Sequence, residues 1–111
     1  MDFLLEQGEK RSLLEVKGCT LERERVGWFP DAPTLRGAKH LRELAAARQA
    51  GWDCILAFVI AMPQVYRVLP NRETDPAFGE ALAAAEKAGV RVLHLPCCVG
   101  PDRLEICETR E

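Results

Sequence analysis

The chain has 111 residues, of which 48% are hydrophobic and 29% are charged, and its formal net charge is −2. This composition excludes an intrinsically disordered chain, because the apolar fraction is high and the net charge is small. It also argues against a protein that coats nucleic acid through bulk positive charge, while leaving room for a local basic patch. We expect a single domain over residues 1–111, since a chain of this length can bury a substantial core.

The apolar runs and the cysteines predict a soluble, cytoplasmic protein. The longest apolar run, residues 54–62, is far shorter than the roughly 18 residues that a membrane span needs. Residues 1–6 contain no basic segment of the kind that opens a signal peptide. The five cysteines form no C-x-x-C pair, which favours small buried thiols in a reducing compartment over a disulfide framework.

Two strands joined by a hairpin loop are predicted at the start of the chain. They cover residues 2–6 and 12–21, with a polar, Gly-containing loop over 7–10. A polar stretch over 22–25 and a rigid loop over 27–33 follow. Thr34 is a typical N-cap for a helix that continues to residue 50 and is ended by Gly51.

A buried strand, a second helix and two further strands are predicted next. The apolar run over 53–62 is typical of a buried central strand and ends before Pro63. Asp75 followed by Pro76 marks the start of a helix over 76–88. Strands over 90–95 and 104–108 complete an α/β domain with a mixed sheet, in which a hairpin precedes strand–helix–strand crossovers.

The first hairpin brings acidic residues together. Because side chains alternate along a strand, Glu15 and Lys17 share one face of the strand over 12–21. If Glu6 and Arg11 close the loop, Asp2 lies directly opposite Glu15, with about 4.5–5.5 Å between their Cβ atoms. Two carboxylates at that distance repel each other unless a divalent cation lies between them, and carboxylate oxygens with water are what Mg²⁺ accepts.

Lys17 then has a chemical role beside such a metal ion. It can orient a water molecule or stabilise negative charge that develops on a phosphate. The alternative is an ordinary solvated strand face, because Glu-x-Lys triplets are common in proteins.

The first helix is basic within an acidic chain, with four Lys and Arg residues against one Glu. One arc of the helix is apolar and the opposite arc is polar; the polar arc consists of Arg36, Lys39, His40 and Glu43. A basic face near a pair of metal-binding carboxylates suits a phosphodiester backbone. A solvated helix face explains the same pattern equally well.

A zinc site is a weaker alternative. His94, Cys97, Cys98 and Cys107 have donor atoms that suit zinc. However, adjacent cysteines on an extended segment point to opposite faces, so both cannot easily reach one ion.

Several segments together resemble the SfsA family, the sugar fermentation stimulation proteins. They are Asp2-Phe3-Leu4-Leu5, Leu14-Glu15-Val16-Lys17, Phe29-Pro30-Asp31-Ala32-Pro33-Thr34, Arg36-Gly37-Ala38-Lys39-His40-Leu41 and Asp75-Pro76-Ala77-Phe78. The resemblance covers nearly the whole chain, and the joint spacing of these segments is highly specific.

The resemblance implies an α/β, restriction-endonuclease-like fold of the PD-(D/E)xK type, a mixed β-sheet flanked by helices. It implies a metal-dependent nuclease that acts on DNA or RNA, with Mg²⁺ or Mn²⁺ as cofactor. By position, Asp2 and Glu15 would be the metal ligands and Lys17 the catalytic lysine. Arg36, Lys39 and His40 would face the site or the phosphates of a nucleic acid.

The chain departs from the family pattern in two respects. Leu35 stands where the family has a Glu. The chain also starts at the aspartate, so we expect it to lack the family's N-terminal OB-like domain and the first helix and strand of the nuclease core. A homodimer could cover the exposed edge of the hairpin.

Two functions therefore remain open. The first is a Mg²⁺-dependent nuclease that hydrolyses phosphodiester bonds, and the second is a DNA-binding regulatory module of sugar metabolism without turnover. A third possibility is an isolated fragment in which neither function is intact.

Overall fold

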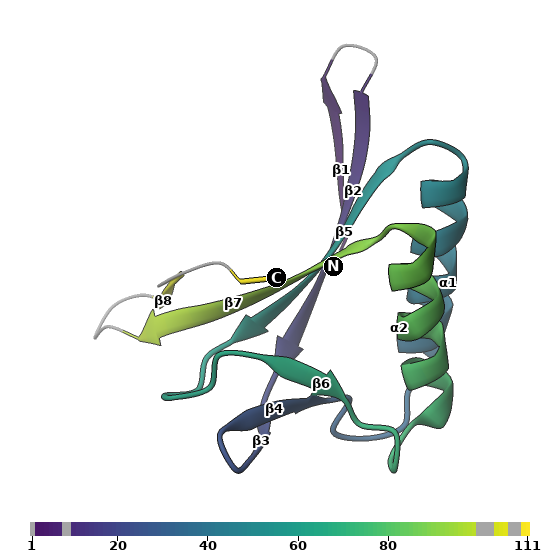
Figure 1. Ribbon diagram of the computed structural model, residues 1–111. Helices are drawn as coiled ribbons and strands as arrows, with labels where there is room; N and C mark the ends of the chain where they lie inside the picture. Colours follow the sequence, from purple (N-terminus) through teal and green to yellow (C-terminus); the bar gives the residue numbers. More distant parts are fainter. Residues whose placement is uncertain (1, 8–9, 100–103, 107–109) are drawn as a thin grey trace.

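The computed structural model describes residues 2–7, 10–99, 104–106 and 110–111. Over these residues a five-stranded sheet has the order β1-β2-β5-β7-β8 (Figure 1). Its central strands β2, β5 and β7 are parallel, and β1 and β8 pair antiparallel at the two edges. The strands are β1 Asp2–Gln7, β2 Lys10–Cys19, β5 Asp53–Ile60, β7 Arg91–Val99 and β8 Leu104–Ile106. The predicted mixed sheet is confirmed; residues 107–108 of the last predicted strand lie outside the described residues.

A second, smaller sheet was not predicted. It consists of β3 Leu21–Arg23, β4 Val26–Phe29 and β6 Val68–Pro70. The prediction of a loop over 27–33 is therefore wrong for residues 27–29, which pair in parallel with β6. This pairing joins segments far apart in the chain, so the local sequence pattern contains no signal for it.

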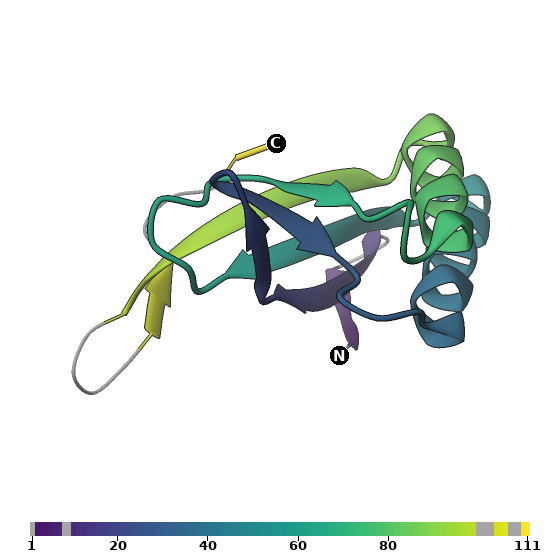
Figure 2. The same cartoon turned by 90° about the horizontal axis from the view of Figure 1, so that it is seen from below.

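Both helices lie on the same side of the main sheet (Figures 1 and 2). They are α1 Leu35–Gln49 and α2 Pro76–Ala88, and both predicted N-caps are confirmed. The Thr34 hydroxyl accepts the Gly37 N–H at 3.2 Å, and the Asp75 carboxylate accepts the Phe78 N–H at 3.0 Å. In the described part of the chain, no helix is long and apolar enough to cross a bilayer.

Asp75 ties the two helix starts together. Besides capping α2 through Oδ1, its carboxylate accepts the Thr34 N–H through Oδ2 at 2.9 Å. The residue is buried, and a buried carboxylate is stable only when its oxygens receive hydrogen bonds. One side chain therefore fixes where α1 begins relative to α2.

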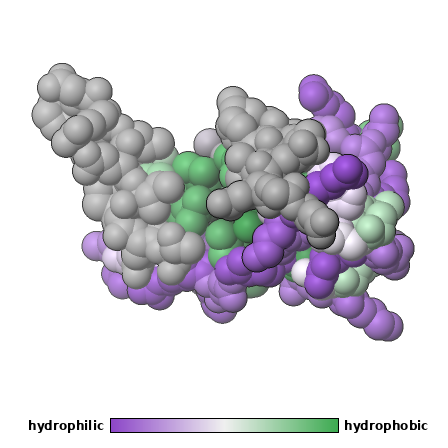
Figure 3. Space-filling view, turned by 90° about the horizontal axis from the view of Figure 1, so that it is seen from above, coloured by the Kyte–Doolittle hydropathy of each residue, from purple (hydrophilic) through white to green (hydrophobic). Residues whose placement is uncertain are grey.

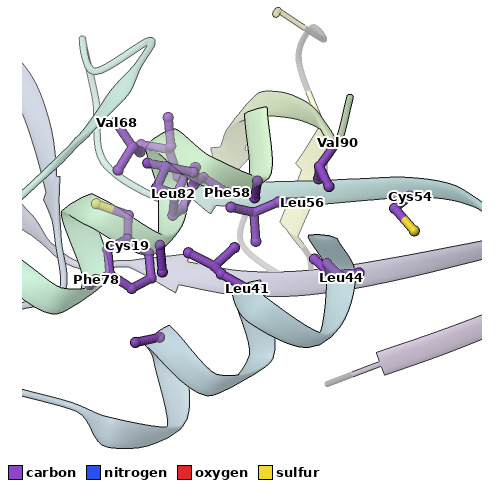
Figure 4. Packing of buried hydrophobic residues seen from close by; sticks show 14 of the residues in the cluster. Cys19, Leu41, Leu44, Cys54, Leu56, Phe58, Val68, Phe78, Leu82 and Val90 are labelled. Atoms are coloured by element: carbon purple, nitrogen blue, oxygen red, sulfur yellow. The ribbon is translucent and has the colours of Figure 1, made fainter. Parts of the chain in front are cut away.

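The core lies between the helices and the main sheet (Figure 4). The ring of Phe29 from β4 packs against Phe58 of β5 and Phe78 of α2, with centroids 5.7 and 5.1 Å apart. The small sheet therefore closes the core at the end where α2 begins. The largest fully buried side chains are Phe58, Phe78, Leu41, Leu56, Ile60, Val65, Cys19 and Cys54.

The opposite face of the main sheet is apolar as well. Its half-buried side chains alternate with the core residues along β2, β5 and β7. Figure 3 shows hydrophobic surface between the two grey segments, on the side that the helices do not cover. The described apolar side chains of this face include Leu14, Val16, Ile55, Ala57, Val59, Leu93 and Leu95.

His94 joins the two sheets. Its Nδ1 accepts the Val68 N–H at 2.9 Å, which connects β7 to β6. This bond occupies one ring nitrogen of the histidine that was considered for zinc, while Cys107 lies outside the described residues. Burial, and then the positive charge of Arg67, lower the pKa of His94 below its ordinary value of 6.5.

This lowered pKa predicts an acid-sensitive contribution to stability. Below pH 6.5 the unfolded chain binds more protons at this position than the folded one, so the free energy of unfolding falls as the pH drops from 6.5 through the folded-state pKa. His94→Asn keeps an acceptor for the Val68 N–H but does not titrate, so its stability should depend less on pH. Urea unfolding of both proteins between pH 8 and 5 measures this; parallel pH profiles would contradict the assignment.

Candidate metal and nucleic-acid site

The hairpin has the predicted register. Asp2 pairs with Glu15, and Glu6 pairs with Arg11, across the antiparallel ladder of β1 and β2. On its other side Glu15 pairs with Leu56 of the central strand β5. The position of Glu15 is thus fixed by backbone hydrogen bonding between β2 and both of its neighbours.

Glu15 lies beneath α1 and not in solvent. Its side chain is 3% exposed, on the same sheet face as Leu56, which is completely buried. The alternative of an ordinary solvated strand face is therefore wrong for Glu15. A carboxylate at such a depth requires strong hydrogen-bond donors, because transfer from water is otherwise costly.

Lys17 and His40 supply those donors. The Lys17 Nζ atom lies 2.9 Å from Glu15 Oε1, and His40 Nδ1 lies 3.0 Å from the same oxygen. Lys17 Nζ and His40 Nδ1 are themselves 3.0 Å apart, so the three groups form a closed triangle. A protonated Nδ1 donates to Glu15, whereas an unprotonated Nδ1 accepts from Lys17; the ammonium can donate to the carboxylate in both cases.

A small recess opens beside this triangle. It has a volume of about 60 Å³ and is lined by Leu13, Leu14, Glu15, His40, Glu43 and Leu44, which is enough room for ordered water. Glu43 was not among the predicted site residues. Its i,i+3 spacing from His40 is the sequence signal for its place beside the site.

Arg36 and Lys39 lie on the exposed side of α1. Lys39 is 68% exposed and lies 4.0 Å from Glu43. The structure therefore brings Glu15, Lys17 and His40 into contact, pairs the Asp2 backbone with that of Glu15, and leaves Arg36 and Lys39 at the surface. Leu35, which departs from the family pattern, is 92% exposed and takes no part in the triangle.

Comparison with known proteins identifies relatives across nearly the whole chain. Residues 1–103 match the family described as "Sugar fermentation stimulation protein RE domain". A sugar fermentation stimulation protein homolog from Desulfitobacterium hafniense is 50% identical over 104 residues, which cover 94% of this chain and 46% of that protein. The homolog from Methanothermobacter thermautotrophicus is 45% identical over 93 residues, or 84% of this chain and 39% of that protein.

A solved structure has the same fold. It is that of Pyrococcus furiosus SfsA in complex with Ca²⁺, with a TM-score of 0.87 and 26% sequence identity over 96% of this chain and 46% of that one. The predicted restriction-endonuclease-like α/β fold is thereby confirmed. The chain spans about half the length of the relatives that it matches.

The triangle predicts strong thermodynamic coupling between Glu15 and Lys17. Glu15→Ala removes the carboxylate from a largely buried ammonium, so we expect a loss of stability on the order of 3 kcal/mol. The double variant Glu15→Ala/Lys17→Ala should lose less than the sum of the two single variants, with a coupling energy of about 1–3 kcal/mol. A double-mutant cycle based on urea unfolding measures this.

The exposed pair Lys39–Glu43 is the matched control for that cycle. It lies on the surface of one helix, where such a pair contributes only about 0.3–0.5 kcal/mol. If the coupling of Glu15 to Lys17 were as small as that of the control pair, the triangle would not be a buried charge network.

Proposed function

Because this chain belongs to the sugar fermentation stimulation protein family, we propose that it is a nuclease-like domain that hydrolyses phosphodiester bonds in DNA or RNA with Mg²⁺ or Mn²⁺. The observation that carries the proposal is the buried Glu15 carboxylate, held by Lys17 and paired in register with Asp2. A carboxylate beside a lysine, with a second acidic residue opposite it in the ladder, suits a metal ion and a hydrogen-bond donor to a phosphate.

The donor set fits a hard divalent cation. Glu15 has a buried carboxylate, and Asp2 is the residue that pairs with it across the hairpin. Mg²⁺ is usually bound through one or two carboxylates together with water and substrate phosphates. The Ca²⁺ complex of the Pyrococcus furiosus relative supports a divalent-cation site in the family. A bound ion would polarise the phosphate and activate a water molecule.

The protein's own groups have distinct tasks in this proposal. Lys17 donates from Nζ, either to the attacking water or to a phosphate oxygen on which charge accumulates. His40 acts as a positioning residue, because its Nδ1 contacts both Glu15 and Lys17 at 3.0 Å. The apolar walls of the recess, Leu13 and Leu44, limit access of bulk water to the carboxylate.

The exposed side of α1 suits the nucleic-acid backbone. Arg36 and Lys39 lie there, at and after the start of the helix, where the free N–H groups and the helix dipole also favour anions. This basic surface is also the observation that favours the second candidate function, a DNA-binding regulatory module without turnover.

The nuclease proposal predicts metal-dependent cleavage that depends on Lys17. Loss of one donor to the reacting phosphate costs about 10²–10³ in rate, so Lys17→Ala should slow cleavage by that factor. Glu15→Ala should abolish cleavage and also the thermal stabilisation by Mg²⁺ or Mn²⁺, which is about 2.7 kcal/mol at a hundredfold excess over Kd. Assays on DNA and RNA with each metal, together with thermal shift, measure both effects.

Lys87→Ala is the matched control, because it removes an exposed lysine of α2 and should leave the cleavage rate unchanged. A Lys17→Ala protein that cut both substrates at the wild-type rate would remove Lys17 from the mechanism. Binding of DNA without cleavage, unaffected by Glu15→Ala, would favour the regulatory module instead.

The surface of α1 predicts salt-dependent binding to nucleic acid. Each phosphate contact contributes about 0.9 to the slope of log K against log salt, so the variant Arg36→Ala/Lys39→Ala should reduce the magnitude of the slope by about 2. Fluorescence anisotropy on duplex DNA at several salt concentrations measures it. An unchanged slope would place the phosphate contacts elsewhere on the domain.

A further inference from the structure

A second cavity lies away from the Glu15 triangle. It has a volume of about 610 Å³ and is lined by residues of α2, of the segment over 66–70 that includes β6, and of the start of β7, together with Arg110 and Glu111. This volume is in the range of small-molecule binding sites. Glu15, Lys17 and His40 do not line it, so it is separate from the proposed metal site.

One side of the cavity is apolar and aromatic. The half-buried side chains of Leu69, Pro70 and Val92 contribute apolar surface to its lining. Tyr66 also lines the cavity and is 46% exposed; among the described residues, Leu35 is the other exposed large hydrophobic residue. The Arg110 guanidinium lies over the Tyr66 ring, 5.0 Å from its centroid. This combination offers a flat surface to a planar ring.

The charged side chains of the cavity are mainly arginines. Arg67, Arg91 and Arg110 line it together with Glu86 and Glu111, which gives a positive balance within a chain of net charge −2. Arg91 Nε donates to Glu111 Oε1 at 2.9 Å, but both side chains are more than half exposed. An exposed ion pair of this kind contributes little to stability. An anion with two or more oxygens can therefore replace Glu111 as the acceptor for the guanidinium N–H groups of Arg91.

His94 adds a donor of fixed tautomer. Because its Nδ1 accepts the Val68 N–H at 2.9 Å, the neutral ring carries its proton on Nε2. The ring is held in place by Phe58, whose centroid lies 6.0 Å away in a stacked arrangement. His94 lines the cavity together with Arg67, Arg91 and Arg110, and its neutral ring has one hydrogen-bond donor.

We propose that this cavity binds a nucleoside monophosphate. The aromatic base packs against the Tyr66–Arg110 pair and the apolar lining, and the phosphate pairs with Arg91. This ligand class matches the two halves of the lining, because it joins a planar ring to a dianion. The inference depends on the cavity alone and not on the proposed nuclease activity.

Calorimetric titration tests the proposal, with AMP, adenosine and inorganic phosphate as probes. AMP should bind more tightly than either of the other two, since only AMP uses both halves of the cavity. Arg91→Ala and Tyr66→Ala should each weaken AMP binding by about tenfold, the loss expected for one charge-assisted hydrogen bond or one stacking surface. Tyr66→Phe keeps the ring and should bind as the wild type does.

A matched control tests whether binding is specific to the cavity. Arg42→Ala removes an exposed arginine of α1 and should leave AMP affinity unchanged. Circular dichroism establishes that each variant is folded. The proposal is overturned if AMP does not bind, if phosphate alone binds equally well, or if Arg42→Ala weakens binding as much as Arg91→Ala does.

Discussion

The burial of the Glu15 carboxylate under α1 is the constraint on which the site and the docking of the helix both depend. A charged side chain that is only 3% exposed costs several kcal/mol unless donors replace the lost water. One donor, Lys17, comes from the same strand, and the other, His40, comes from the helix. The position in which α1 covers Glu15 is therefore also the position in which His40 contacts the carboxylate.

The position of α1 is set at a distance from the site. Asp75 accepts the Thr34 N–H at the start of α1 and caps α2 through its other oxygen. Further along, Leu41 and Leu44 of α1 are buried in the core. The hydrogen bond of the Thr34 N–H and the burial of Leu41 and Leu44 together fix the position of α1, and with it the distance between His40 and β2. The chemistry of the triangle thus depends on a capping residue of the other helix.

Local rules were sufficient for the hairpin and the helices. The prediction that Glu6 pairs with Arg11 was enough to place Asp2 opposite Glu15, because an antiparallel register follows from one correct pair. The caps at Thr34 and Asp75 likewise depend on nearest neighbours in the sequence. These features need no knowledge of the rest of the fold.

Features that depend on distant segments could not be predicted in this way. The strand over residues 27–29 exists because β6 pairs with it. The helical pattern placed His40 on the polar arc, opposite the core, whereas in the structure it lies at the border between core and surface and contacts Glu15. A helical wheel divides a helix into two sides, but a helix on a twisted sheet has margins where a polar side chain can reach a buried partner.

On the helix-facing side of the main sheet, the polar groups also occur at the margins of the buried layer. One row of the sheet consists of Lys17, Phe58 and His94 on neighbouring strands. The middle residue, Phe58, is 1% exposed. The outer two residues bind groups from the layer above the sheet, which are His40 of α1 and the Val68 N–H of β6.

The polar atoms at the two ends of the row are satisfied by different elements. The triangle and the cavity beside His94 are therefore chemically independent, although they share one row of the sheet. Phe58 separates them: it packs against His94 on one side and pairs with Lys17 on the other. Over the described residues, two helices and two sheets in this way hold two separate groups of polar side chains at opposite margins of a single apolar layer.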